Sequence, residues 1–114
     1  MLTGTSFETL VRVGWQNLKN QETAINAMNV FPVSDGDTGT NMRLTVENGL
    51  NRARSNENLG QYATELSLGM LLGARGNSGV ILSQLFKGIA QAFAGHESAD
   101  SALLAQALRQ GAEK

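Results

Sequence analysis

Two carboxylates flank one glycine in the segment 29–42, which reads NVFPVSDGDTGTNM. Asp35 and Asp37 stand on either side of Gly36, and short polar side chains follow directly. A tight turn that aims several hard oxygen ligands at one point suits a hard divalent cation, above all Mg²⁺. Mg²⁺ held by one or two carboxylates usually also binds substrate phosphates. The segment therefore indicates a metal-assisted phosphoryl-transfer site.

The acidic segment could also have a purely structural role. Asp, Gly, Thr and Asn are ordinary residues of turns and helix caps, so this role stays open. Two known kinds of ligand loop are excluded by residue spacing. An EF-hand loop that starts at Asp35 needs Gly at its sixth position and Glu at its twelfth, where Thr40 and Val46 stand instead. A Walker A loop is excluded because the sequence has no Gly-Lys dipeptide.

A second segment with possible ligand chemistry has glycines at a spacing of three, namely Gly73, Gly76 and Gly79. Glycine lets the backbone approach a ligand closely, while Asn77 and Ser78 add donors and Arg75 adds positive charge. The segment leads into a predicted helix, whose first N–H groups and dipole favour an anion. Residues 38–41 offer the same geometry where another helix begins. A plain turn between two helices is the alternative.

Composition limits the function classes. The chain has 114 residues and a net charge of −1, so it forms one small domain and has no basic patch for nucleic acid. Without cysteine it has neither disulfides nor thiolate metal sites. His96 lies in a polar stretch that predicts a solvated loop and not a metal ligand. We find no signal peptide and no apolar run long enough for a membrane span, which predicts a cytoplasmic protein.

The hydrophobic periodicity predicts an all-α fold, an antiparallel bundle or barrel without strands. Thr5 to Glu8 has the spacing of a capping box at the start of a helix that runs to about Asn20. A short second helix is predicted over 21–28, and a third begins near Gly39 or Thr40. Two further helices are predicted over 59–73 and 80–94, and Ser98 or Asp100 caps a last one. That last pattern is still helical at the final residue, so we expect a fragment of a longer protein.

The two segments together resemble the nucleotide-binding domain of the dihydroxyacetone kinase superfamily. They are most similar to the N-terminal, ATP-binding domain of bacterial fatty acid kinase. The resemblance rests on the segment 29–42, on GARGNSGVILSQ over 73–84 and on AINAM over 24–28. It covers essentially the whole chain. It extends over only about the first half of the family's nucleotide-binding domain, so residues 1–114 would be the N-terminal part of that domain.

The resemblance implies a helical barrel that binds Mg-ATP at one end. Asp35 and Asp37 would hold the metal ions, and Asn29 would stand where dihydroxyacetone kinases have a further aspartate. Phosphates or ribose would contact the residues that open the third helix: Thr38, Gly39, Thr40 and Asn41. The facing phosphate loop would consist of Gly76, Asn77, Ser78 and Gly79. Leu82 and Met70 would line the base pocket unless they belong to the core. Ser34 departs from the family's usual proline and would stiffen the turn less.

The implied reaction transfers the γ-phosphoryl group of ATP to a fatty acid carboxylate that a separate fatty-acid-binding protein presents. No catalytic side chain beyond the metal and phosphate ligands is expected, because a carboxylate is already ionised at neutral pH. The alternatives are a subunit of a dihydroxyacetone kinase or phosphotransferase, an inactive oligomerising fragment, and a non-enzymatic Mg²⁺ or nucleotide sensor. Because half a barrel exposes apolar helix faces, we also expect the fragment to form a homodimer.

Overall fold

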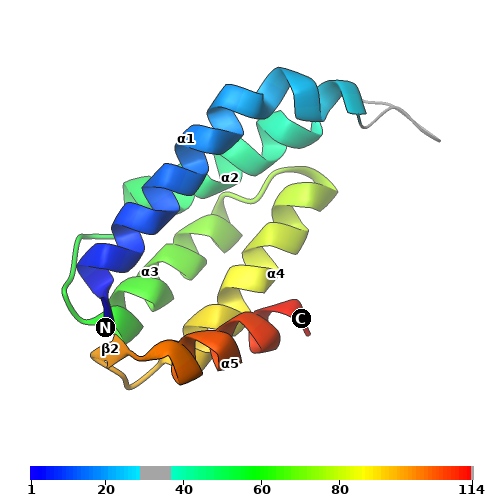
Figure 1. Cartoon of the computed structure of the whole chain (residues 1–114). Coiled ribbons are helices and arrows are strands. Elements are labelled where there is room, and N and C mark those ends of the chain that lie inside the picture. The colour runs from blue at the N-terminus through cyan, green and yellow to red at the C-terminus, as the bar shows by residue number, and fades with distance from the viewer. Residues whose placement is uncertain (29–36, 114) are drawn as a thin grey trace.

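The computed structural model describes residues 1–28 and 37–113, which form five helices and one short β-ribbon (Figure 1). In chain order the elements are β1 (Leu2–Thr3), α1 (Gly4–Met28), α2 (Thr38–Arg52), α3 (Leu59–Leu72), α4 (Gly76–Phe93), β2 (Ser98–Ala99) and α5 (Ser101–Ala112). The predicted all-α fold is confirmed.

The helices pack in the order in which they occur in the chain. α1 lies along α2, α2 contacts α3, α3 contacts α4, and α5 packs on α4. α2 also contacts α4 directly. Figure 1 shows that the turn between α3 and α4 lies toward the same end of the bundle as the start of α2, while both β-strands lie at the other end. This arrangement brings the starts of α2 and α4 close together.

The core is built around α3, whose buried residues recur at helical spacing. Leu59, Tyr62, Leu66 and Met70 are completely buried. Phe7 of α1 packs edge-on against Tyr62, with ring centroids 6.3 Å apart, and against Phe93 of α4, at 5.7 Å. These aromatic contacts tie α1 to the α3–α4 pair at the end of the molecule that lies away from the α3–α4 turn.

The N-terminal helix differs from the prediction in two ways. α1 is one continuous helix, not two, because its sequence has no proline or glycine between Trp15 and Met28 that would break it. Its cap also lies earlier than the predicted box. Thr3 Oγ1 accepts from the Ser6 backbone N–H at 3.2 Å, and Ser6 Oγ accepts from the Thr3 N–H at 2.8 Å. The reciprocal cap is therefore formed by Thr3 and Ser6, not by Thr5 and Glu8.

Two further predictions need correction, and one choice is settled. α4 begins at Gly76 and not at Val80, so the Gly-Asn-Ser-Gly sequence is its first turn. β1 and β2 pair antiparallel, although strands were not predicted. Strands of two residues are too short to show alternation. Asp100, not Ser98, caps α5, because its carboxylate accepts from the Leu103 N–H at 2.8 Å.

None of the helices in the described ranges combines the length and the apolar character that crossing a membrane requires. The exposed position of His96, in the turn after α4, agrees with its prediction as a loop residue.

Candidate functional site

The first turns of α2 and α4 meet at one end of the bundle. Ser78 Oγ donates to the backbone oxygen of Thr38 at 3.4 Å. A Cβ atom on Gly76 would lie only 2.3 Å from Asn41 Nδ2, which shows how closely the two turns approach. Gly76 has a φ of +67°, a backbone conformation that favours glycine. Two motifs that lie far apart in the sequence thus form one surface.

A polar stripe on α2 fixes the turn that precedes α4. Asn41, Thr45 and Asn48 follow one another at helical spacing and face this turn. Thr45 Oγ1 accepts from the Arg75 backbone N–H at 3.1 Å and donates to the Asn41 oxygen at 2.8 Å. Asn48 Nδ2 donates to the Gly73 oxygen at 3.1 Å. Thr45 and Asn48 were not predicted as site residues, although their helical spacing from Asn41 is a signal that could have found them.

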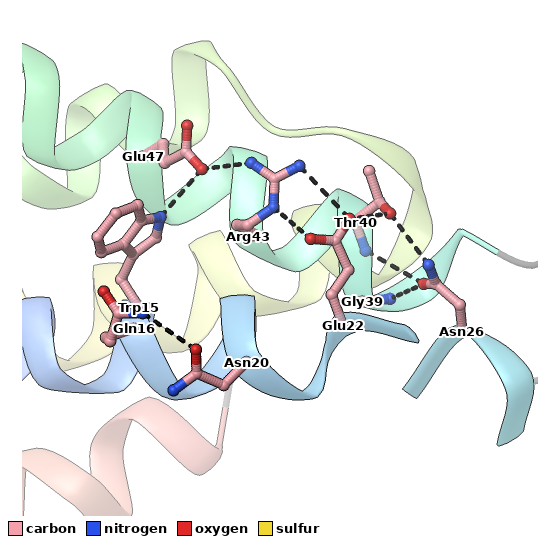
Figure 2. A network of polar contacts seen from close by, with 9 residues as sticks. All are labelled: Trp15, Gln16, Asn20, Glu22, Asn26, Gly39, Thr40, Arg43 and Glu47. Carbon is pink, nitrogen blue, oxygen red and sulfur yellow. Dashed lines mark hydrogen bonds and ion pairs between the residues drawn. The ribbon is translucent and has the colours of Figure 1, made fainter. Parts of the chain in front are cut away.

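The other side of the α2 N-terminus is held by α1 (Figure 2). Asn26 Oδ1 accepts from the backbone N–H of Gly39 at 2.7 Å and from that of Thr40 at 3.2 Å. Asn26 Nδ2 lies 3.1 Å from Thr40 Oγ1 and donates to it. A Cβ on Gly39 would lie 2.9 Å from the Glu22 backbone oxygen, so this glycine permits the close contact between the helices.

A charged network continues from this contact along α1 and α2 (Figure 2). Arg43 donates from Nε to Glu22 Oε1 at 2.6 Å and from Nη1 to Glu47. Trp15 Nε1 donates to Glu47 Oε2 at 3.0 Å. The hydrogen bonds from Arg43, and then from Thr40, lower the pKa of Glu22.

The two remaining members of the network also have shifted pKa values. Burial raises the pKa of Glu47, but the hydrogen bonds from Trp15 and Arg43, with the charges of Arg43 and Lys19, together outweigh it, so the net shift is downward. The bonds to Glu22 and Glu47 raise the pKa of Arg43. All three groups are therefore charged at neutral pH, and they hold the start of α2 against α1.

The predicted phosphate-contacting residues divide into two sets. Gly39 and Thr40 face α1, while Thr38 and Asn41 contact α4 through the atoms described above. In the first turn of α4, Gly76 and Asn77 are exposed, Ser78 is half-buried and Gly79 is buried against Thr45. The proximity of the two turns agrees with a shared site, although their ligand remains a prediction.

The predicted metal ligands are only partly described. Asp37 is the residue directly before α2 and occupies its N-cap position. Asp35 and Asn29 lie outside the described residues. Within the described ranges, no three His, Asp or Glu side chains gather as a metal site would require. The Asp37 position next to two helix N-termini still supplies a hard oxygen donor of the kind that Mg²⁺ prefers.

The two residues suggested for a base pocket lie in different surroundings. Met70 is fully buried, and its Cγ lies against Gly49, so it packs in the core. Leu82 lines an apolar groove of about 400 Å³ that starts at Ser78. The groove is also lined by Met42, Ile81, Leu85, Gly111 and Ala112. It opens directly beside the first turn of α4.

Comparison with known proteins assigns the chain to a family. The DAK2 domain profile matches residues 32–114. Uncharacterized proteins of Staphylococcus aureus strains USA300 and COL are each 43% identical to this chain over 114 residues. The match covers 98% of this chain and 21% of each relative. The chain thus spans about a fifth of the length of these relatives.

Proposed function

This chain belongs to the DAK2 domain family, a nucleotide-binding family of the dihydroxyacetone kinase type, and on that premise we propose a specific function. The chain is the Mg-ATP-binding part of a kinase that phosphorylates the carboxylate of a protein-bound fatty acid. The observation that carries the proposal is the meeting of two helix N-termini beside Asp37. Such an arrangement concentrates backbone N–H groups and dipoles where a polyphosphate and its metal would bind.

Within this site the first turn of α4 is the better place for phosphate. In α2 the N–H groups of Gly39 and Thr40 already donate to Asn26. In α4 the N-cap residue Arg75 makes no side-chain capping bond, and its own side chain is exposed and cationic. We therefore propose that Gly76, Asn77 and Ser78 hold the phosphates by backbone N–H groups, with Thr38 and Asn41 at the edge.

Mg²⁺ fits the oxygen donors before α2, and we propose Asp35 and Asp37, with Asn29 as a neutral third ligand, as the residues that hold it. When bound, the ion would neutralise the negative charge of the phosphates. The apolar groove at Leu82 lies where the base of a nucleotide held at Ser78 would reach. The side chains thus position the nucleotide and help to neutralise the charge of its phosphates. Phosphoryl transfer depends mainly on these two effects.

The proposed acceptor needs no general base. One carboxylate oxygen of the fatty acid attacks the γ-phosphorus, and the bond from that phosphorus to the bridging β-γ oxygen breaks. The products are an acyl phosphate and ADP. The segment from Asn29 to Pro32, which precedes the acidic turn, resembles that of fatty acid kinase. This resemblance favours a fatty acid over dihydroxyacetone as the acceptor.

A phosphoryl-transfer assay with both acceptors tests the proposal. The longest natural protein that contains this chain is incubated with radiolabelled Mg-ATP and either a fatty acid on its binding protein or dihydroxyacetone. We expect label only on the fatty acid, and none with the Asp35→Asn/Asp37→Asn variant. Glu97→Gln, which changes an exposed acid directly before β2, is the control and keeps full activity. Transfer to dihydroxyacetone alone would contradict the proposed substrate.

A further inference from the structure

The side chain of Thr45, in the middle of α2, is completely buried and links two helices. Its hydroxyl donates to the Asn41 backbone oxygen of its own helix at 2.8 Å. The same oxygen accepts from the backbone N–H of Arg75, the N-cap residue of α4, at 3.1 Å. A hydroxyl has only one proton to donate, and the bond to Asn41 uses it. The lone pairs of the oxygen are therefore left to face the Arg75 N–H.

α2 holds the short turn between α3 and α4 at both of its ends. The turn consists of residues 73–75. At its first residue, the Gly73 oxygen accepts from Asn48 Nδ2 at 3.1 Å. A Cβ on Gly73 would lie 2.4 Å from Asn48 Cγ, so this side chain packs directly on the turn backbone. At its last residue, Thr45 holds the Arg75 N–H. Two side chains one helical turn apart on α2 thus fix the turn.

The start of α4 takes its position from this turn. The Gly79 N–H donates to the Arg75 oxygen at 3.1 Å and forms the first hydrogen bond of α4. The N–H groups of residues 76–78 precede this bond and have no partner within the helix. Arg75 is therefore both the residue that Thr45 holds and the residue on which the helix begins. Any change in the orientation of Arg75 would also turn the N–H groups of 76–78.

We propose that Thr45 is a positioning residue that, through Arg75, sets the direction of the first N–H groups of α4. A group that is already held in its binding orientation does not have to be ordered when the ligand arrives, and this raises affinity. The holding of the turn stands on the contacts above. Its consequence for phosphate binding rests on the proposed function.

Amide hydrogen exchange followed by NMR tests the holding of the turn without any ligand. Thr45→Val keeps the shape of the side chain but removes the hydroxyl, whereas Thr45→Ser keeps the hydroxyl. Exchange of the Arg75 N–H should become about fivefold or more faster in Thr45→Val and stay within about twofold of wild type in Thr45→Ser. Equal exchange in the two variants, or a wild-type rate in Thr45→Val, would overturn the proposal.

A matched control and a second variant accompany this experiment. Thr9 is exposed on α1, and its hydroxyl also donates to the backbone oxygen four residues earlier, that of Thr5, at 3.2 Å. Thr9→Val should leave the exchange of the Arg75 N–H as in wild type. If Thr45→Val does not fold, Asn48→Ala releases the other end of the turn and should also speed this exchange. An unchanged rate in Asn48→Ala would show that α2 does not fix the turn.

Titration calorimetry with Mg-ATP tests the consequence for binding, at a temperature at which every variant is folded. We expect Thr45→Val to weaken binding about fivefold or more, and Thr45→Ser and Thr9→Val to stay within about twofold of wild type. A hydroxyl with a merely structural role would lower the Tm when removed and leave the affinity unchanged, which would overturn the positioning role.

The two experiments separate failure of this proposal from failure of the proposed function. If the wild-type chain does not bind Mg-ATP, the proposed function fails, and the role of Thr45 in phosphate binding fails with it. The exchange of the Arg75 N–H still decides whether Thr45 holds the turn. If the wild type binds Mg-ATP and Thr45→Val binds it equally well, only the positioning role is overturned.

Discussion

At the residue scale, the contact between the two helix starts depends on small side chains. A Cβ on Gly79 would lie 2.3 Å from Thr45 Oγ1, a hydroxyl that is fixed by bonds to Arg75 and Asn41. This hydroxyl cannot move without breaking the attachment of the α3–α4 turn. Gly79 thus allows α4 to approach α2, whatever its role toward a ligand.

Gly79→Ala should therefore destabilise the chain by about 1–3 kcal/mol, as overpacking at a close contact does. Gly14 is the matched control, because it lies in the exposed part of α1 and a Cβ there would meet no atom within 4 Å. Gly14→Ala should stabilise the chain by about 0.5–1 kcal/mol. Urea unfolding of both variants checks the pair. Equal effects of the two substitutions would show that the contact at Gly79 is not tight.

The chemistry of single site residues could be predicted from the sequence better than their partners could. Asn41 and Gly76 were both expected at the site, but no local pattern states that the two lie side by side on one surface. Asn26 and Glu22 were missed as residues that support the site, because their contacts with Thr40 depend on where α2 returns along α1. Since Asp35 and Asn29 lie outside the described residues, their metal-binding role stays a prediction.

At the scale of elements, the α1–α2 pair is joined by the ion pair of Arg43 with Glu22, while the ion pair of Arg43 with Glu47 lies within α2. The pKa of Glu22 in the folded chain is lowered from its usual 4.5, by the Arg43 bond first and the Thr40 bond second. A lowered pKa means that the folded state favours the carboxylate. The resulting stabilisation is present above pH 4.5 and is lost as the pH falls through the lower, folded pKa.

Glu22→Gln should therefore lower the Tm at neutral pH, and the Tm values of the two proteins should converge as the pH falls below 4.5 and through the lowered pKa of Glu22. Circular dichroism melts at several pH values measure this difference. The exposed Glu97→Gln serves as the control and should keep the wild-type Tm at neutral pH. A Glu22→Gln deficit that stays constant over this pH range would mean that the ion pair does not stabilise the α1–α2 contact.

Helical periodicity predicted α2, α3 and α5 closely, because each has an apolar face and a clear polar or capped start. It failed where glycines were taken as breaks. The first turn of α4 contains Gly76 and Gly79 and is still helical, since Gly76 takes up the one positive φ that the entry to the helix requires. The ribbon of β1 and β2 was missed, because its two pairs depend on contacts between distant parts of the chain.

At the scale of the whole molecule, apolar side chains remain exposed on α3 and α4. Leu68 and Leu71 of α3 line a groove of about 280 Å³ together with residues of α4, and Leu68 is 54% exposed. Ile81 of α4 is 70% exposed. Patches of this kind are usually covered by another element or another chain. They agree with the exposed helix faces on which the homodimer prediction rests.

The homodimer can be tested by light scattering after size-exclusion chromatography at several concentrations. We expect the 114-residue chain to elute as a dimer and Leu68→Lys to give a monomer, because a charge in the groove opposes its burial. Leu108 of α5 is equally exposed, at 53%, and Leu108→Lys should leave the dimer intact. A monomeric wild-type chain at all concentrations would rule out the dimer.

The central claim, that the joined starts of α2 and α4 bind a Mg-nucleotide with the acidic turn, is tested most directly by calorimetric titration of ATP into the 114-residue chain. The titration is run with and without Mg²⁺, for the wild type and for Asp35→Ala/Asp37→Ala. We predict binding that requires Mg²⁺ and is lost in the double variant. Absence of binding, or binding that is unchanged without Mg²⁺ and in the double variant, would contradict this claim.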